Sequence, residues 1–114
     1  MSEQVDRKLP RLHVVDGVGT LMARIRDIAT DTSNVFLTDH AVNRMIQRGI
    51  SDVEVFGALR IGEIQGAPWL ENGNCRACKV VLLRKGDRAI GVVTILLDEK
   101  GELVVKTVEW EDWE

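Results

Sequence analysis

Residues 38–62, TDHAVNRMIQRGISDVEVFGALRIG, predict two short helices that follow one another with only a glycine turn between them. The first helix is predicted over about 39–48. Thr38 or Asp39 supplies its N-cap, because a short polar side chain there can accept a bond from a free backbone N–H. Gly49 ends this helix, since glycine adopts the left-handed conformation of a helix C-cap at little cost.

The second helix is predicted over about 51–61 and has the stronger start signal. Ser51 and Glu54 stand three positions apart, which is the spacing of a capping box, where each side chain bonds the backbone N–H of the other. The face of this helix that we expect to be buried carries Val55, Phe56 and Leu59.

After Gly62 the apolar pattern changes from a helical period to that of a sheet. The segments between the predicted strands are short and carry turn residues, so neighbouring strands must run antiparallel. Helices followed by such a sheet indicate the α+β class. We therefore expect a four-stranded antiparallel meander, with strands over about 63–70, 76–84, 88–97 and 102–110.

Before this region, apolar residues at helical spacing predict a further helix over about 17–30. Residues 1–16 are expected to form an extended arm, because Pro10 disfavours an early helix. The expected organisation is an N-terminal arm and extra helix over 1–35, a single α+β domain over 36–110, and an acidic tail over 111–114.

The composition is that of an ordinary soluble domain. The 114 residues are 45% hydrophobic and 29% charged, which excludes collagen-like and low-complexity chains. No apolar run reaches the roughly 18 residues that a membrane span needs, and the charged N-terminus lacks the apolar core of a signal peptide. We therefore expect a cytoplasmic protein that is not inserted in a membrane.

The net charge of −3 hides an uneven distribution along the chain. Residues 40–90 carry eight Lys and Arg against five Asp and Glu, whereas residues 109–114 carry four acids and no base. A mildly basic middle is compatible with an anion-binding face, and it also fits a mixed solvated surface.

The helix predicted over 39–48 carries the clearest functional pattern. At about 100° per residue, its polar side chains fall within one arc of roughly 100°. Arginine presents a planar fork of donors that suits phosphate oxygens, and histidine exchanges a proton near neutral pH. Arginines four residues apart are also common on exposed helices, and the histidine could simply bond a neighbouring carbonyl. The arc comprises His40, Arg44, Gln47 and Arg48, while Ala41, Val42, Met45 and Ile46 are expected to pack on the sheet.

The run of residues 40–50, HAVNRMIQRGI, resembles a domain-of-unknown-function family of small bacterial proteins with the signature H-A-x-x-R-M-x-x-R-G-I. The resemblance extends over roughly residues 36–97. That family lies near the RelE/BrnT-type toxins, in which two helices precede a four-stranded antiparallel sheet. The resemblance implies RNA cleavage or RNA binding in a toxin–antitoxin setting, with an antitoxin protein as partner. It carries these roles onto His40, Arg44 and Arg48 only.

A metal-independent endoribonuclease would use these residues as follows. The ribose 2′-hydroxyl attacks the adjacent phosphorus, His40 transfers the proton, and Arg44 and Arg48 stabilise charge on the phosphoryl oxygens. Arg84 and Arg88 are candidates for further phosphate contacts. A second proton-transfer group is also needed, and nothing in the sequence selects between Glu63 and Asp39.

The sequence is also compatible with two other functions. In one, the protein is a non-catalytic homodimeric binding module whose polar helix face holds a partner. In the other, a zinc ion is bound by two cysteines and two histidines. We favour neither a metal nor a cofactor, because structural zinc normally uses two close-spaced ligand pairs and these histidines stand alone. Cysteines three apart on a strand also point to opposite faces. The formal zinc ligands are Cys75, Cys78, His13 and His40.

Three of the five aromatic residues are tryptophans. Trp69 and Trp110 border predicted strands, so we expect them to pack rather than to stack on bases. Trp113 lies in the acidic segment 109–114, which could bind to the arc of His40, Arg44, Gln47 and Arg48 in place of phosphate.

Overall fold

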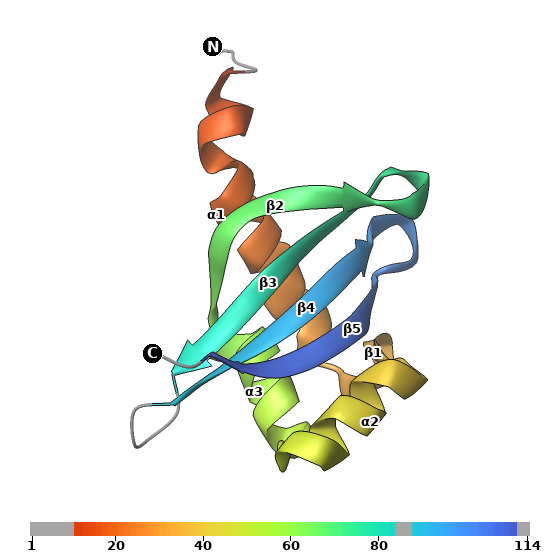
Figure 1. Cartoon of the computed structure of the whole chain (residues 1–114). Helices are drawn as coiled ribbons and strands as arrows, with labels where there is room; N and C mark the ends of the chain where they lie inside the picture. Colours follow the sequence, from red (N-terminus) through yellow and green to blue (C-terminus); the bar gives the residue numbers. More distant parts are fainter. Residues whose placement is uncertain (1–10, 84–87, 112–114) are drawn as a thin grey trace.

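The computed structural model describes residues 11–83 and 88–111, and shows one sheet with helices against it (Figure 1). The three helices are α1 (Arg11–Ala29), α2 (Asp39–Arg48) and α3 (Asp52–Ile61). The strands are β1 (Val35–Leu37), β2 (Glu63–Glu71), β3 (Cys75–Leu83), β4 (Ala89–Leu97) and β5 (Glu102–Glu111). Short 3-10 turns separate some of them: η2 (Thr32–Asn34), η3 (Asn72–Asn74) and η4 (Asp98–Lys100).

The sheet is mixed, with the strand order β1-β5-β4-β3-β2. Strands β2 to β5 form the expected antiparallel meander, while β1 pairs with β5 in parallel. The α+β class is confirmed, and the expectation of four strands, all antiparallel, is wrong. The additional strand, β1, is only three residues long, which is too short for its sequence to show a strand period. Its register is Val35 opposite Leu103 and Leu37 opposite Val105.

Helix α1 starts at Arg11, so the prediction of an extended arm through residue 16 is wrong. A proline restricts helix formation at its own position and before it, but the residues that follow can be helical. No helix among the described residues combines the length and the apolar character that a membrane crossing requires.

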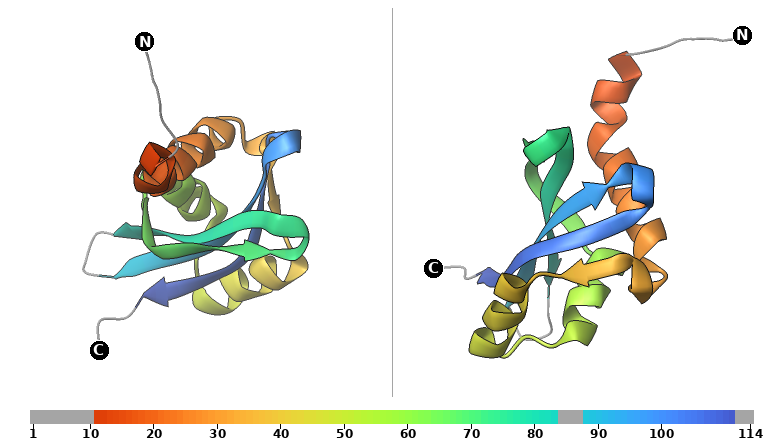
Figure 2. Two further views of the ribbon diagram at one scale, coloured as in Figure 1. Left: turned by 90° about the horizontal axis from the view of Figure 1, so that it is seen from above. Right: turned by 90° about the vertical axis from the view of Figure 1, so that its right-hand side faces the viewer.

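Helices α1 and α3 cover one face of the sheet, and α2 lies away from them, along β5 (Figure 2). The core between the two helices and the sheet is continuous, and its largest fully buried side chains include Leu21, Ile25, Val55, Leu59, Val80, Val92 and Leu103. The capping box that starts α3 is present as predicted, with Ser51 and Glu54 bonded in both directions. Local caps thus set where α3 begins, and its apolar face then fixes it on the sheet.

Helix α2 covers the outer edge of β5 where β1 ends. The hydroxyl of Thr38, which caps α2, shares its single proton between the carbonyls of Val105 and Lys106, which lie at 3.1 and 3.2 Å. At the other end of α2, Nη1 of Arg48 donates to the carbonyl of Val108 at 3.0 Å. The indole N–H of Trp110 donates to the carbonyl of Arg48 at 2.9 Å. These bonds satisfy backbone groups that an open strand edge would leave unpaired.

Only a narrow side of α2 is buried in this arrangement. Ala41 and Met45 are buried against β5, but Val42 is 38% exposed and Ile46 is 74% exposed. The expectation that all four residues pack on the sheet is therefore wrong for Val42 and Ile46. A helix laid along a strand edge has a smaller contact surface than one laid across a sheet face.

Because Thr38 both caps α2 and bonds to β5, its substitution should lower the stability of the protein. Thr38→Ala removes the cap of α2 and the hydroxyl's shared bond to β5, so the free energy of unfolding should fall by about 1–2 kcal/mol. Urea denaturation measures this change. Thr20→Ala, at an exposed site in α1, should change stability by less than about 0.5 kcal/mol. Equal effects of the two substitutions would contradict this role for Thr38.

Candidate functional site

His40 and Arg44 lie next to each other on the outer side of α2. His40 is exposed in the first turn of the helix, and Arg44 follows one turn later. Nε of Arg44 donates to Nε2 of His40 at 3.4 Å, and its Nη1 donates to Oε1 of Gln47 at 3.0 Å. The guanidinium is therefore held from two sides by residues of the same helix. The bond to His40 is long and requires an unprotonated Nε2 as acceptor.

Arg48 shares this polar arc but is directed to β5. One of its amino groups holds the carbonyl of Val108, so Arg48 fixes α2 on the strand while keeping further donors. Within residues 11–83 and 88–111, neither Arg44 nor Arg48 forms an ion pair with a carboxylate. Five other cations of that part do: Arg24, Arg26, Arg76, Lys79 and Lys106.

Arg88 lies near Arg48 through a shared tryptophan. The guanidinium carbon of Arg88 stands 4.0 Å from the centre of the Trp110 ring, and the indole N–H of Trp110 bonds the carbonyl of Arg48. Trp110 packs against the core, as predicted. Of the four predicted phosphate-binding arginines, Arg48 and Arg88 thus both contact Trp110, and Arg44 lies one turn before Arg48 on α2. The fourth, Arg84, lies outside the described residues.

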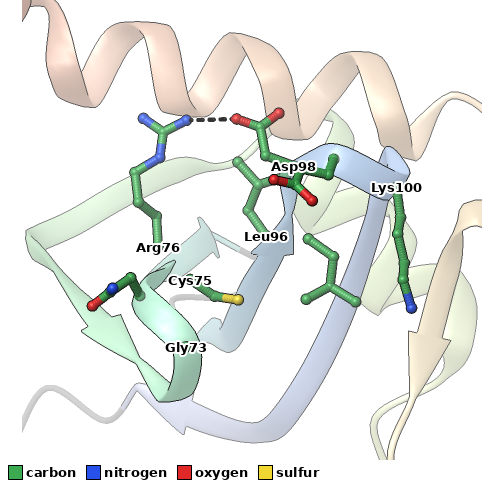
Figure 3. Close-up of a pocket in the computed structure, with 9 residues that line it drawn as sticks. Gly73, Cys75, Arg76, Leu96, Asp98 and Lys100 are labelled. Atoms are coloured by element: carbon green, nitrogen blue, oxygen red, sulfur yellow. Dashed lines mark hydrogen bonds and ion pairs between the residues drawn. The ribbon is translucent and has the colours of Figure 1, made fainter.

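The outer side of α2 is exposed at His40 and Gln47. Two cavities among the described residues lie elsewhere: one of about 510 Å³ borders α3, β2, β3 and β4. The other, of about 360 Å³, lies between η3 and η4. Figure 3 shows this second cavity, with the thiol of Cys75 pointing into it and Arg76 paired with Asp98 at its rim. Neither cavity contains a residue of α2.

The two cysteines do not face a common site. Cys78 is fully buried, and burial raises the pKa of its thiol to about 11. Cys75 is half-buried at the start of β3. Residues three apart on a strand point to opposite faces, which matches the prediction for this pair. A buried thiol with a raised pKa remains protonated at neutral pH and is a poor metal ligand.

Sequence reasoning missed a charged cluster on the sheet face that α1 and α3 leave uncovered. Nζ of Lys79 on β3 lies 2.9 Å from Oε1 of Glu111 and 3.5 Å from Oε2 of Glu109, both on β5. Burial and the neighbouring Glu111 raise the pKa of Glu109, and bonding to Glu111 raises the pKa of Lys79. The only sequence signal is the alternation of Glu109 and Glu111, which places both on one face of a strand.

This cluster depends on Gly91 of β4, the strand between β3 and β5. A Cβ atom at Gly91 would lie 2.6 Å from Oε2 of Glu111 and 3.2 Å from Cδ of Lys79. The absence of a side chain lets Lys79 and Glu111 meet over the middle strand. It also means that two acids of the segment 109–114 belong to β5 and are bound to Lys79, while residues 112–114 lie outside the described part.

Two other predicted groups can be placed. Glu63, a candidate for the second proton-transfer group, is paired with Arg26 at 3.0 Å on another part of the surface. Asp39, the other candidate, is exposed in the first turn of α2 beside His40. Trp69 is 39% exposed on the edge strand β2, and its indole N–H donates to Glu71, so it packs less than we predicted.

In the comparison with known families, the model described as Domain of unknown function (DUF4258) matches residues 37–110, more than half of the chain. The matched region begins at the end of β1 and includes α2, α3 and β2 to β5 almost to its end. Helix α1 lies outside it. Neither the search of curated proteins nor the search of solved structures gave a match.

Because a Cβ atom at Gly91 would lie too close to Glu111, we expect the substitution of Gly91 by alanine to destabilise the protein. Gly91→Ala forces Glu111 away from Lys79, so the free energy of unfolding should fall by about 1–3 kcal/mol. Gly19→Ala is the matched control, because a Cβ at Gly19 meets no atom within 4 Å and alanine favours the helix by about 1 kcal/mol. Thermal or urea unfolding of both variants measures the difference. A Gly91→Ala protein as stable as the wild type would show that the ion pairs tolerate displacement.

Proposed function

This chain belongs to the DUF4258 family, and we propose that it acts on RNA through the outer side of α2. Here Arg44 and Arg48 bind phosphate groups of the RNA, and His40 serves as the proton-transfer residue of a metal-independent endoribonuclease. A protein with this function works in the cytoplasm, where its substrate is found. The finer placement of the chain near the RelE/BrnT-type toxins, with an antitoxin as protein partner, is part of the same proposal.

One observation carries the proposal: the two guanidiniums of α2 make no ion pair within the described part of the chain, whereas Arg24, Arg26, Arg76, Lys79 and Lys106 do. Their positive charge is therefore not cancelled locally and is available to an anion. The bond from Arg44 to Gln47 orients the guanidinium and leaves its second amino group for a phosphate oxygen. An arginine held in this way loses little side-chain entropy when it binds.

The shape of the site favours a polymer over a small molecule. Small ligands bind mainly in concave pockets that cover most of their surface, whereas His40 and Gln47 of α2 are exposed. An exposed row of cationic and polar side chains instead suits an extended strand that contributes several phosphates.

The arrangement of His40 and Arg44 permits a specific reaction. The 2′-oxygen of a ribose attacks the adjacent phosphorus, its proton passes to Nε2 of His40, and the bond from phosphorus to the 5′-oxygen breaks. The leaving 5′-oxygen takes a proton from the imidazolium or from water, which gives a 2′,3′-cyclic phosphate and a 5′-hydroxyl. Arg44 stabilises the added charge on the phosphoryl oxygens. The long bond between His40 and Arg44 is readily exchanged for one to the substrate.

Two substitutions separate binding from cleavage. Arg44→Gln should weaken the binding of single-stranded RNA by about tenfold. It should also make the slope of log affinity against log salt concentration shallower by about one, because one phosphate contact is lost. His40→Gln should leave binding within about twofold and reduce the cleavage rate by about 10²–10⁴-fold. Fluorescence anisotropy and gel analysis of cleavage, both in the presence of a chelator, provide the two measurements.

Lys100→Gln is the matched control for Arg44→Gln. It removes one exposed positive charge at η4, away from α2, so it should change neither binding nor cleavage. DNA of the same sequence should bind through its phosphates and resist cleavage, because it lacks the 2′-hydroxyl. The proposal is wrong if the wild-type protein does not bind RNA, or if Lys100→Gln weakens binding as much as Arg44→Gln. Cleavage that survives His40→Gln removes His40 from the mechanism.

The toxin relationship has a separate basis and a separate test. Residues 40–50 carry the H-A-x-x-R-M-x-x-R-G-I pattern, and the helices α2 and α3 precede the four antiparallel strands β2 to β5. Helix α1 and strand β1 are additions to that plan. Controlled expression in a bacterial host should arrest growth for the wild type and not for His40→Gln. Equal growth of both strains would contradict a toxin role.

A second candidate function is a non-catalytic homodimeric binding module, and the apolar residues exposed on the side of α2 opposite the polar arc favour it. Ile46 is 74% exposed and Val42, one turn before it, is 38% exposed. Large apolar side chains that cluster on a surface usually mark a contact with another molecule. A second copy of this chain would bury both. Sedimentation at micromolar concentrations should then show a dimer that Ile46→Ser dissociates, and a wild-type monomer would exclude this candidate.

A further inference from the structure

The sheet face that α1 and α3 leave uncovered carries a continuous row of apolar side chains. In Figure 1 this face is turned toward the viewer, and α1 and α3 lie behind the sheet. The strand registers place one apolar residue of each strand side by side across it. The residues at the two ends of the row, Phe36 and Trp69, are 47% and 39% exposed. In spatial order the row consists of Phe36, Val104, Ile95, Ala77 and Trp69.

The middle strand β4 has the sequence of a strand that is covered on both faces. Its residues, AIGVVTILL, include only one polar side chain. Ile90 and Val92 belong to the core under α1 and α3. Val93 and Ile95 alternate with the core residues of β4, so they point to the other face, where neither is part of that core. An antiparallel sheet with one solvated face normally alternates apolar and polar residues. The pattern of β4 therefore indicates that a second layer covers this face.

Neither edge of the sheet is suited to a further strand, so a partner has to lie on the face. At one edge, β1 is only three residues long and α2 follows it along β5. At the other edge, the pairing of β2 shifts between Gln65 and Trp69, around Gly66 and Pro68. A proline has no N–H to donate, and irregular edges of this kind prevent the addition of strands.

An ion pair that crosses the face shows that it is concave. Nζ of Lys106 on β5 lies 3.2 Å from Oε2 of Glu71 on β2, although β3 and β4 separate the two strands. In a flat sheet, three strand spacings amount to about 14 Å. The sheet therefore curves toward this side, which suits a cylindrical element such as a helix. A second copy of the same concave face would not be complementary to it.

The charges on this face include an excess carboxylate. Lys106 and Glu71 balance each other, but Nζ of Lys79 is shared by Glu111 at 2.9 Å and Glu109 at 3.5 Å. The side chain of Glu109 is 40% exposed and can be reached from solvent. Burial and the neighbouring Glu111 raise the pKa of Glu109, as expected for a carboxylate whose charge is only partly offset. A positive side chain of a partner would offset the remaining charge.

We propose that this concave sheet face binds an amphipathic helix of a partner protein, whose apolar side chains contact the row from Phe36 to Trp69 and whose lysine or arginine pairs with Glu109. The surface belongs to the strands and not to the outer side of α2. This inference therefore does not rest on the proposed function, and either can fail without the other.

Two synthetic helices of about 14 residues test the inference by calorimetry. One carries leucine on one side and lysine on the other, and its analogue carries glutamate in place of lysine. The wild type should bind the lysine helix at least about tenfold more tightly than the glutamate helix, because like charges repel at Glu109. Phe36→Ser should weaken binding of the lysine helix by about tenfold, since apolar contact is lost. Glu109→Gln should weaken it by about threefold.

Two exposed positions outside the face supply the matched controls. Leu70 is 63% exposed and alternates with Trp69 on β2, so it points away from the row. Glu99 is exposed in η4. Leu70→Ser and Glu99→Gln should each leave binding within about twofold of the wild type, and thermal unfolding checks that all four variants fold.

Three results would overturn the inference. The first is that the wild type does not bind the lysine helix or binds both helices equally. The second is that Leu70→Ser weakens binding as much as Phe36→Ser. The third is a dimer in sedimentation that Phe36→Ser dissociates, because a second copy would then occupy the face in place of a partner helix.

Discussion

The attachment of α2 to the outer edge of β5 determines how the rest of the surface is arranged. Strand β1 covers only the first part of that edge, and the remaining carbonyls need donors. Thr38 and Arg48 supply them from the two ends of α2, and Trp110 returns a bond to the end of the helix. Because the helix lies along the edge, most of its circumference stays in solvent, including the row from His40 to Gln47.

The distribution of ion pairs explains why this row, and not another, is the best candidate for anion binding. Lys79 holds two carboxylates over Gly91, and Arg24 and Arg76 share Asp98. These pairs join elements that are distant in sequence, and they leave little net charge where they lie. The guanidiniums on α2 bond to a histidine, an amide and a carbonyl, which are neutral partners that orient a charge without cancelling it.

The sequence predicted α2, α3 and the meander well because their signals are local. The caps at Thr38, Ser51 and Gly49 mark the helix ends, and turn residues mark most strand ends. Strand β1 could not be predicted, since it is short and its partner lies almost 70 residues further along the chain. The exposure of Ile46 and the bonds of Lys79 were missed for the same reason. Both depend on which element lies beside which, and no residue pattern within one element records that. The polar arc of α2 was visible from its helical spacing, but the direction of Arg48 toward β5 was not.

A titration of the isotope-labelled full chain with octauridylate, followed by amide chemical shifts, tests the central claim most directly. If RNA binds along the outer side of α2, shifts should concentrate in residues 39–48, and they should shrink as salt is added. Shifts confined to the β2–β3 hairpin or to the cluster around Lys79, or no shifts at all, would contradict the account.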